Sequence, residues 1–278
     1  MRWAWLVALW LGACAQADTI RFAPLPLVDE KTLRTQYLPM LDYLAAKTGD
    51  DYRWVYYEQY HDLLAALVDD KVDLAVLGPL PYAEISGRKG GFEALVEFLE
   101  SDGKADYHCA LVSFGPAGKL TLRDIRDKRI GLTQPESTCG YFAVALMLKR
   151  VGLAPDRDGN RFEYADDHTK AALGVLQGRY DVAGVKRNLA DRYAHLGLTV
   201  IAEAGPFPAF VLVANSRRLS VAKRRAIRAA MLAADPAARA EWGGLIQRGT
   251  VPVQEELYEE VRRNLETVAP IPGMLSIR

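Results

Sequence analysis

One stretch of the sequence combines the residue types that bind small anions. Residues 135–141, Pro-Glu-Ser-Thr-Cys-Gly-Tyr, read as a polar loop that enters an apolar helix predicted over residues 141–148. Ser137 or Thr138 would cap that helix. A helix start leaves its first amides without an intrahelical acceptor, and here these amides belong to Cys139, Gly140 and Tyr141. Together with the helix dipole and two hydroxyls they would suit an oxyanion. The alternative is an ordinary cap that satisfies its own backbone.

The overall charge gives no support for a polyanionic partner. The chain has 278 residues, of which 50% are hydrophobic and 25% charged, and its formal net charge is zero. We therefore expect no binding to nucleic acid, and an anion site must come from a local arrangement of dipoles and donors.

The amino terminus is typical of an exported protein. Arg2 precedes an apolar run over residues 3–13, and Ala15-Gln16-Ala17 offers a cleavage site. We therefore predict a signal peptide over residues 1–17 and a periplasmic protein after cleavage near Ala17. Residues 11–14, Leu-Gly-Ala-Cys, also resemble a lipoprotein signal, so the alternative is a lipid anchor on Cys14.

The elements that must position the anion site alternate between strands and helices. Residues 19–22 and 52–57 are predicted strands, and Pro39 is predicted to start the helix between them. Helix and strand then alternate to the end of the chain, and no segment after Ala17 is long and apolar enough to span a membrane. The fold class is α/β.

An internal repeat divides the chain. Residues 60–75 match residues 168–183 position for position, each as a helix, a polar turn and a strand that opens with x-Asp-apolar-Ala. Such a repeat predicts two lobes of one design, each a mostly parallel sheet flanked by helices. Tyr60 and His168 take the same place at a helix start, where parallel sheets line a ligand crevice.

Two predicted strands mark the crossings between the lobes. They cover residues 107–114 and 209–214, and each follows a polar or Gly/Pro-rich break. The second lobe is then residues 108–207, and the first is discontinuous, with residues 18–107 and 208–278.

Several motifs resemble a known family. They are Leu122-Arg123-Asp124-Ile125, Lys128-Arg129-Ile130-Gly131, the loop 135–141, Asp167-His168, and residues 72–79 with Tyr82 behind them. In order and spacing they are similar to the phosphate/phosphite/phosphonate-binding proteins of ABC transporters. The resemblance implies a two-lobed type II periplasmic binding fold that closes by a hinge. It also implies a monomer that serves a membrane permease, with no catalytic residue, metal or cofactor.

Carried over to this chain, the family's ligand contacts fall on Tyr60, Tyr107, Ser137, Thr138, Cys139 and His168. Phenol, hydroxyl and imidazole donors suit a tetrahedral oxyanion. Without the resemblance, the two tyrosines could equally be core aromatics and His168 a surface residue. We expect Tyr82 to be structural.

Two departures from the family pattern bear on the ligand. Members that hold an aminoalkyl ligand place acidic residues near the cleft, whereas the matching region here offers Lys186, Arg187 and Asn188. An ammonium group is predicted to find no partner, which favours a small anion or one with an apolar or acidic tail.

The second departure is Cys139 in place of the family's usual serine. Cys109 points to the same strand face as Tyr107, so both cysteines are predicted near the cleft. Three interpretations remain: a disulfide, two unrelated buried thiols, or a thiol site for arsenite. The third resembles arsenite-sensing binding proteins that work with a histidine kinase.

The leading functional hypothesis is a non-catalytic receptor that presents a small oxyanion to a permease. A sensor with a kinase ectodomain as its partner is the second. A hydrolase with Cys139 as nucleophile, His168 as base and Asp167 as orienting residue is the third. We disfavour it because the adjacent side chains of Asp167 and His168 diverge at a helix start.

Overall fold

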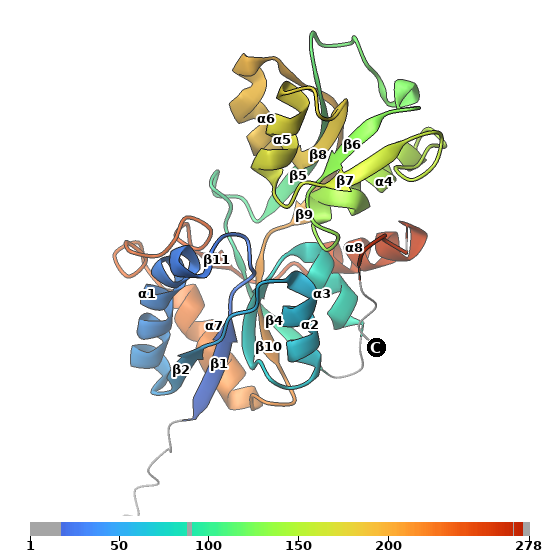
Figure 1. The fold of residues 1–278 in the computed structure, drawn as a ribbon. Helices are drawn as coiled ribbons and strands as arrows, with labels where there is room; N and C mark the ends of the chain where they lie inside the picture. Colours follow the sequence, from blue (N-terminus) through green and yellow to red (C-terminus); the bar gives the residue numbers. More distant parts are fainter. Residues whose placement is uncertain (1–17, 88–90, 269, 275–278) are drawn as a thin grey trace, which may run out of the picture.

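The computed structural model describes residues 18–87, 91–268 and 270–274, and it has the predicted α/β class. Two β-sheets, each flanked by helices, form the two lobes (Figure 1). The predicted signal peptide 1–17, with its cleavage site and Cys14, lies outside the described residues. Within these ranges, none of the helices has the length and apolarity that crossing a bilayer requires.

The first sheet has the strand order β11-β4-β10-β3-β1-β2. Its strands are β1 (Thr19–Ala23), β2 (Asp51–Trp54), β3 (Leu74–Leu77), β4 (Phe92–Phe98), β10 (Val211–Asn215) and β11 (Thr250–Val251). The strands β2, β1 and β3 are parallel, and antiparallel strands extend the sheet on the β3 side.

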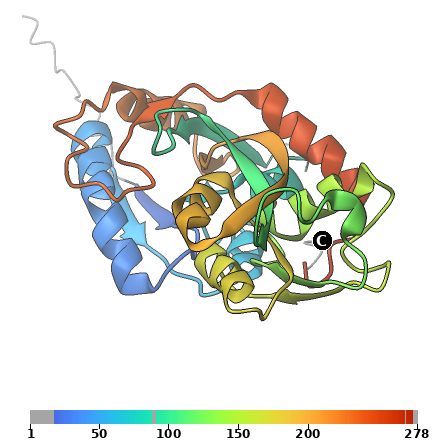
Figure 2. The same cartoon turned by 90° about the horizontal axis from the view of Figure 1, so that it is seen from above.

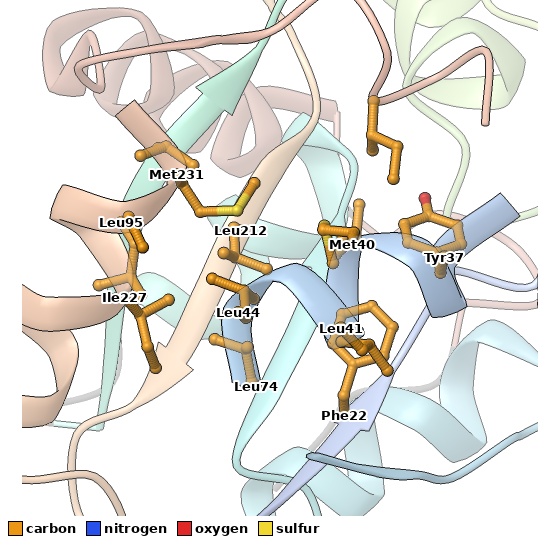
Figure 3. Packing of buried hydrophobic residues seen from close by; sticks show 14 of the residues in the cluster. Phe22, Tyr37, Met40, Leu41, Leu44, Leu74, Leu95, Leu212, Ile227 and Met231 are labelled. Atoms are coloured by element: carbon orange, nitrogen blue, oxygen red, sulfur yellow. The ribbon is translucent and has the colours of Figure 1, made fainter. Parts of the chain in front are cut away.

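Helices cover both faces of this sheet. On one face, α1 (Glu30–Thr48) and α7 (Val221–Ala233) bury an apolar cluster that extends from Ile227 through Leu44 to Phe22 (Figure 3). On the other, α2 (Tyr60–Val68) and α3 (Pro79–Ser86) pack on alternate residues such as Ala75 and Leu77. Burial on both faces explains the uninterrupted apolar sequence of β3.

The helix α1 starts earlier than predicted. Asp29 caps it by accepting a hydrogen bond from the Thr32 amide at 3.0 Å, and Pro39 lies inside the helix. The prediction that Pro39 starts the helix is wrong because the upstream cap and the buried side chains of Leu33 and Tyr37 already commit the preceding turns to the helix.

The second sheet has the order β7-β6-β8-β5-β9. Its strands are β5 (Asp106–Phe114), β6 (Arg129–Leu132), β7 (Arg161–Tyr164), β8 (Val182–Lys186) and β9 (Leu198–Pro208). One face packs on α4 (Ala143–Lys149) and the other on α5 (His168–Leu176) and α6 (Arg187–Tyr193). Short turns η1 (Leu122–Asp124), η2 (Thr138–Phe142) and η3 (Ala194–Leu196) complete this half.

The chain passes between the sheets from β4 to β5 and returns from β9 to β10. We propose the lobe boundaries given above, since the strands of the second sheet lie between residues 106 and 208. The last helix, α8 (Glu255–Val268), contacts both halves (Figures 1 and 2): Tyr258 packs on Tyr82 of α3, and Val261 joins the apolar cluster around α4.

The sequence repeat is also a structural repeat. In the first lobe, the amide of Arg21 donates to Asp73 Oδ2 at 2.8 Å. In the second, the amide of Arg129 donates to Asp181 Oδ2 at the same distance. Each aspartate directly precedes the strand after the repeated helix and joins it to the neighbouring parallel strand. The first residues of the two repeated helices, Tyr60 and His168, therefore occupy equivalent positions.

Candidate functional site

A small cavity lies between the two lobes, at the carboxyl ends of their parallel strands. It encloses about 30 Å³, which is room for roughly two water molecules. Six of the eight residues predicted for the site line it: Tyr60, Tyr107, Ser137, Thr138, Cys139 and His168. The remaining lining residues are Leu25, Leu27, Gly78, Pro81, Glu136, Lys186 and Phe210. Loops and helix starts far apart in the sequence thus meet at the crevice that parallel sheets create.

The first lobe contributes the hydroxyl of Tyr60. This residue begins α2 and is 6% exposed. Burial raises the pKa of Tyr60 well above its usual value, and the negative charge of Glu136 acts in the same direction. The phenol therefore stays protonated and can donate a hydrogen bond.

Thr138 joins the two lobes at the cavity wall. Its Oγ1 accepts a hydrogen bond from the amide of Leu80, in the first turn of α3, at 3.1 Å. It is also hydrogen-bonded to Tyr107, whose pKa burial raises. Thr138 of the second lobe and Tyr107 of the crossing strand β5 are thus linked to a helix start of the first lobe through a single hydroxyl.

His168 offers a neutral donor to the cavity. Its Nδ1 accepts a hydrogen bond from the amide of Lys186 at 3.2 Å, so the ring proton sits on Nε2. Burial lowers the pKa of His168 to about 4, and the Lys186 charge contributes in the same direction. The helix start that carries His168 is capped by Asp167, which accepts a hydrogen bond from the Lys170 amide at 2.8 Å.

The helix after the polar loop begins differently from the prediction. Ser137 makes no capping bond through its side chain, and Gly140, with φ −77° and ψ −127°, is not helical. The turn η2 is wide, and the Gly140 amide already donates to the Ser137 carbonyl at 3.1 Å. A Cβ at Gly140 would lie 2.7 Å from Thr133 Oγ1, so only glycine fits this turn. Of the three amides predicted to be free, the one of Gly140 is therefore already paired.

Two of the predicted residues lie outside the cavity lining. Gly140 faces Thr133 and Gln134 behind the loop. Tyr141 packs edge-on against Phe162, with ring centroids 5.5 Å apart, and its hydroxyl is bonded to Asp156. Burial raises the pKa of Tyr141 to about 12. We leave both residues out of the proposed site.

The two cysteines form a disulfide, which is one of the three interpretations that the sequence allows. Cys109 in β5 and Cys139 at the cavity wall are bonded, with their Cα atoms 5.1 Å apart. The disulfide leaves no S–H group for arsenite and no thiol nucleophile for the hydrolase hypothesis. At the cavity Cys139 thus presents an apolar sulfur where a serine hydroxyl would donate.

Glu136 and Lys186 are site residues that the sequence interpretation did not include. Glu136 lines the cavity and is only 4% exposed, and burial raises its pKa. The prediction that an ammonium group would find no partner did not take this lining residue into account. Its place directly before Ser137 was the only signal in the sequence.

Lys186 ends β8, and its ammonium pairs with Glu100 at 2.6 Å. Burial lowers its pKa, against the opposing effect of Glu100. Lys186 is the last residue of the strand that follows the repeated helix, and His168 begins that helix. This position in the repeat could have indicated that Lys186 lies at the cavity. Its charge is matched within the protein, so recognition in the cavity falls mainly to neutral phenol, hydroxyl and imidazole donors.

The cavity lining also includes the apolar residues Leu25, Leu27 and Phe210. Over the residues that the structure describes, no group of three or more His, Cys, Asp or Glu side chains is arranged to hold a metal ion. A lining that combines hydrogen-bond donors with apolar side chains suits a small oxyanion that carries an apolar substituent.

Sequence comparison matches the chain to periplasmic binding proteins of ABC transporters. A family model described as the periplasmic substrate-binding protein of phosphonate ABC transporters matches residues 22–258. The phosphate-import protein PhnD of Mycolicibacterium smegmatis is 23% identical over 210 residues, which cover 67% of this chain and 64% of that protein.

Two solved structures share the fold. XAC2383 from Xanthomonas citri, bound to ATP, has a TM-score of 0.78 at 17% identity and covers 91% of this chain and 99% of that one. PhnD1 from Prochlorococcus marinus, in complex with methylphosphonate, has a TM-score of 0.75 at 11% identity. The match covers 90% of this chain and 98% of that one.

Proposed function

Because this chain belongs to the phosphonate family of periplasmic substrate-binding proteins of ABC transporters, we propose that it captures a small phosphorus oxyanion in the cavity between its lobes. The protein would act in the periplasm as a monomer and pass its ligand to a membrane permease. The relatives are binding proteins and not enzymes.

The observation that carries this proposal is the composition of the cavity. Donors from both lobes, Tyr60 from the first and Ser137 and His168 from the second, line a single small space together with Tyr107 of the crossing strand β5. An oxyanion in that space would bridge the lobes, so binding would favour the closed arrangement through contacts that the open one lacks.

The size of the cavity and the polarity of its lining favour short-chain phosphonates and phosphite as ligands. A cavity of about 30 Å³ leaves little room beyond a tetrahedral group. The apolar lining residues suit a P–CH₃ or P–H bond, whereas the fourth oxygen of phosphate would face Leu25, Leu27 or Phe210 without a partner. Methylphosphonate and phosphite should therefore bind more tightly than phosphate.

The sensor alternative shares the same ligand step, and the disulfide removes the support that two free thiols would have given to its arsenite form. No other contact in the described residues favours it over transport.

Isothermal titration calorimetry with methylphosphonate, phosphite and phosphate tests the proposal. We expect methylphosphonate and phosphite to bind to one site per chain, and Tyr60→Phe to weaken both by about 10-fold, the effect of one lost hydrogen bond to a charged group. Tyr193→Phe, at a tyrosine of α6 remote from the cavity, is the matched control. The absence of binding by all three anions would exclude this function.

A further inference from the structure

Glu136 is a carboxyl group in a cavity that is otherwise suited to an anion. It is 4% exposed, lines the cavity with Ser137 and Tyr60, and its charge raises the pKa of Tyr60. The ligand contacts that the family resemblance implies do not include this position. A carboxylate near an oxyanion repels it, so the ligand must carry a proton or a positive charge that offsets this repulsion.

The groups around Glu136 do not neutralise it fully. His61 acts electrostatically to lower the pKa of Glu136, but that imidazole also lies 3.2 Å from Asp62. Lys186 is occupied by Glu100. The other titratable groups facing Glu136 or sharing its cavity are uncharged: the phenols of Tyr60, Tyr107 and Tyr164 and the neutral imidazole of His168.

One proton held between Glu136 and the ligand would turn the repulsion into a short, charge-assisted hydrogen bond. Phosphorus oxyanions can bring this proton, because a phosphoryl group has a second pKa of about 6 and its monoanion carries a P–OH. Alkanesulfonates have the same shape and one negative charge but no such proton. An ammonium-bearing ligand could also satisfy the carboxyl, yet the cavity has little space for a second charged group.

We propose that Glu136 is a specificity-determining residue that makes the cavity accept a protonated phosphorus oxyanion and reject a proton-free oxyanion of the same shape. This inference rests on the proposed function and deepens it, since it names the protonation state of the ligand. The carboxyl accepts the P–OH hydrogen bond, while Tyr60, Ser137 and His168 donate to the remaining oxygens.

Calorimetry with methylphosphonate and methanesulfonate, near neutral pH, tests this proposal on the wild-type protein and on Glu136→Gln. We expect the wild type to prefer methylphosphonate by about 100-fold or more, since methanesulfonate leaves a buried carboxylate unpaired. Glu136→Gln should reduce this preference to less than about 10-fold, because the amide can donate to a sulfonate oxygen. Glu241→Gln, at an exposed glutamate of the first lobe, should keep the wild-type ratio.

A second measurement needs no variant. The affinity of the wild type for methylphosphonate should fall as pH rises through the second pKa of the ligand, and titrations in buffers of different ionisation enthalpy should show proton uptake there.

Equal binding of the two anions by the wild type, an unchanged ratio in Glu136→Gln, or tighter binding of aminomethylphosphonate than of methylphosphonate would overturn this inference alone. If the wild type binds no anion, the proposed function fails with it.

Discussion

The ammonium of Lys186 lies 2.6 Å from Glu100 Oε1 and joins the two lobes by an ion pair. Lys186 ends β8 of the second sheet, and Glu100 follows β4 of the first. Their side chains are 14% and 11% exposed, and the ammonium also lies 4.2 Å from the centroid of the Tyr107 ring. The pair is thus buried beside the cavity at the point where the chain crosses between the sheets.

Replacing Glu100 should destabilise the protein more than the loss of a surface ion pair. Glu100→Gln leaves the Lys186 charge buried and unpaired, so we expect the free energy of unfolding to fall by about 3 kcal/mol. Glu163→Gln, which breaks the exposed pair with Arg179, should cost less than about 1 kcal/mol. Urea unfolding at neutral pH measures both values. Equal losses would mean that the Lys186–Glu100 pair behaves like a surface contact.

Loss of the Thr138 hydroxyl should weaken ligand binding. Thr138→Val removes the acceptor for the Leu80 amide and the hydrogen bond to Tyr107. We expect the binding free energy for methylphosphonate to drop by about 1–3 kcal/mol, the cost of unpaired buried groups. Thr267→Val, at an exposed threonine of α8, serves as the control in the same titrations. Wild-type affinity in Thr138→Val would remove this residue from the site.

The stability of the ligand-free protein should fall as the pH drops from 6.5 to 4. The pKa of His168 is lowered from 6.5 to about 4 in the folded protein, so in this window the unfolded chain binds a proton that the folded one does not. For this partly buried ring, the loss is at most about 3 kcal/mol.

His168→Gln should remove that part of the pH dependence, whereas His195→Gln, at an exposed histidine, should keep it. Denaturant unfolding at several pH values between these limits gives the slopes. A His168→Gln variant with the wild-type slope would show that the imidazole titrates normally in the fold.

The repeat explains why two residues of the candidate site could be placed from the sequence. A helix start after a parallel strand has one place in an α/β lobe, so Tyr60 and His168 could be assigned to the crevice from the sequence. The conformation at the start of α4 could not be predicted from the sequence. The turn at Gly140 depends on Thr133 and Gln134, which only the folded loop brings close. Likewise, the contact between Lys186 and Glu100 joins residues 86 positions apart, and no local pattern specifies it.

The disulfide should stabilise the second lobe without being needed for binding. It closes a loop between β5 and the cavity wall with a sequence separation of 30 residues, which predicts about 3–4 kcal/mol from the lost freedom of the unfolded chain. Replacing Cys109 by Ala together with Cys139 by Ser should lower the free energy of unfolding by about this amount.

The same variant should keep its affinity for methylphosphonate or gain some, since a serine hydroxyl at position 139 adds a donor where the sulfur has none. A reducing agent should destabilise the wild type and leave the double variant unchanged in the same urea titration, which separates the covalent link from the packing of the two side chains. If the variant is as stable as the wild type, the disulfide adds no stability. If it no longer binds methylphosphonate, the sulfur bridge itself shapes the cavity wall.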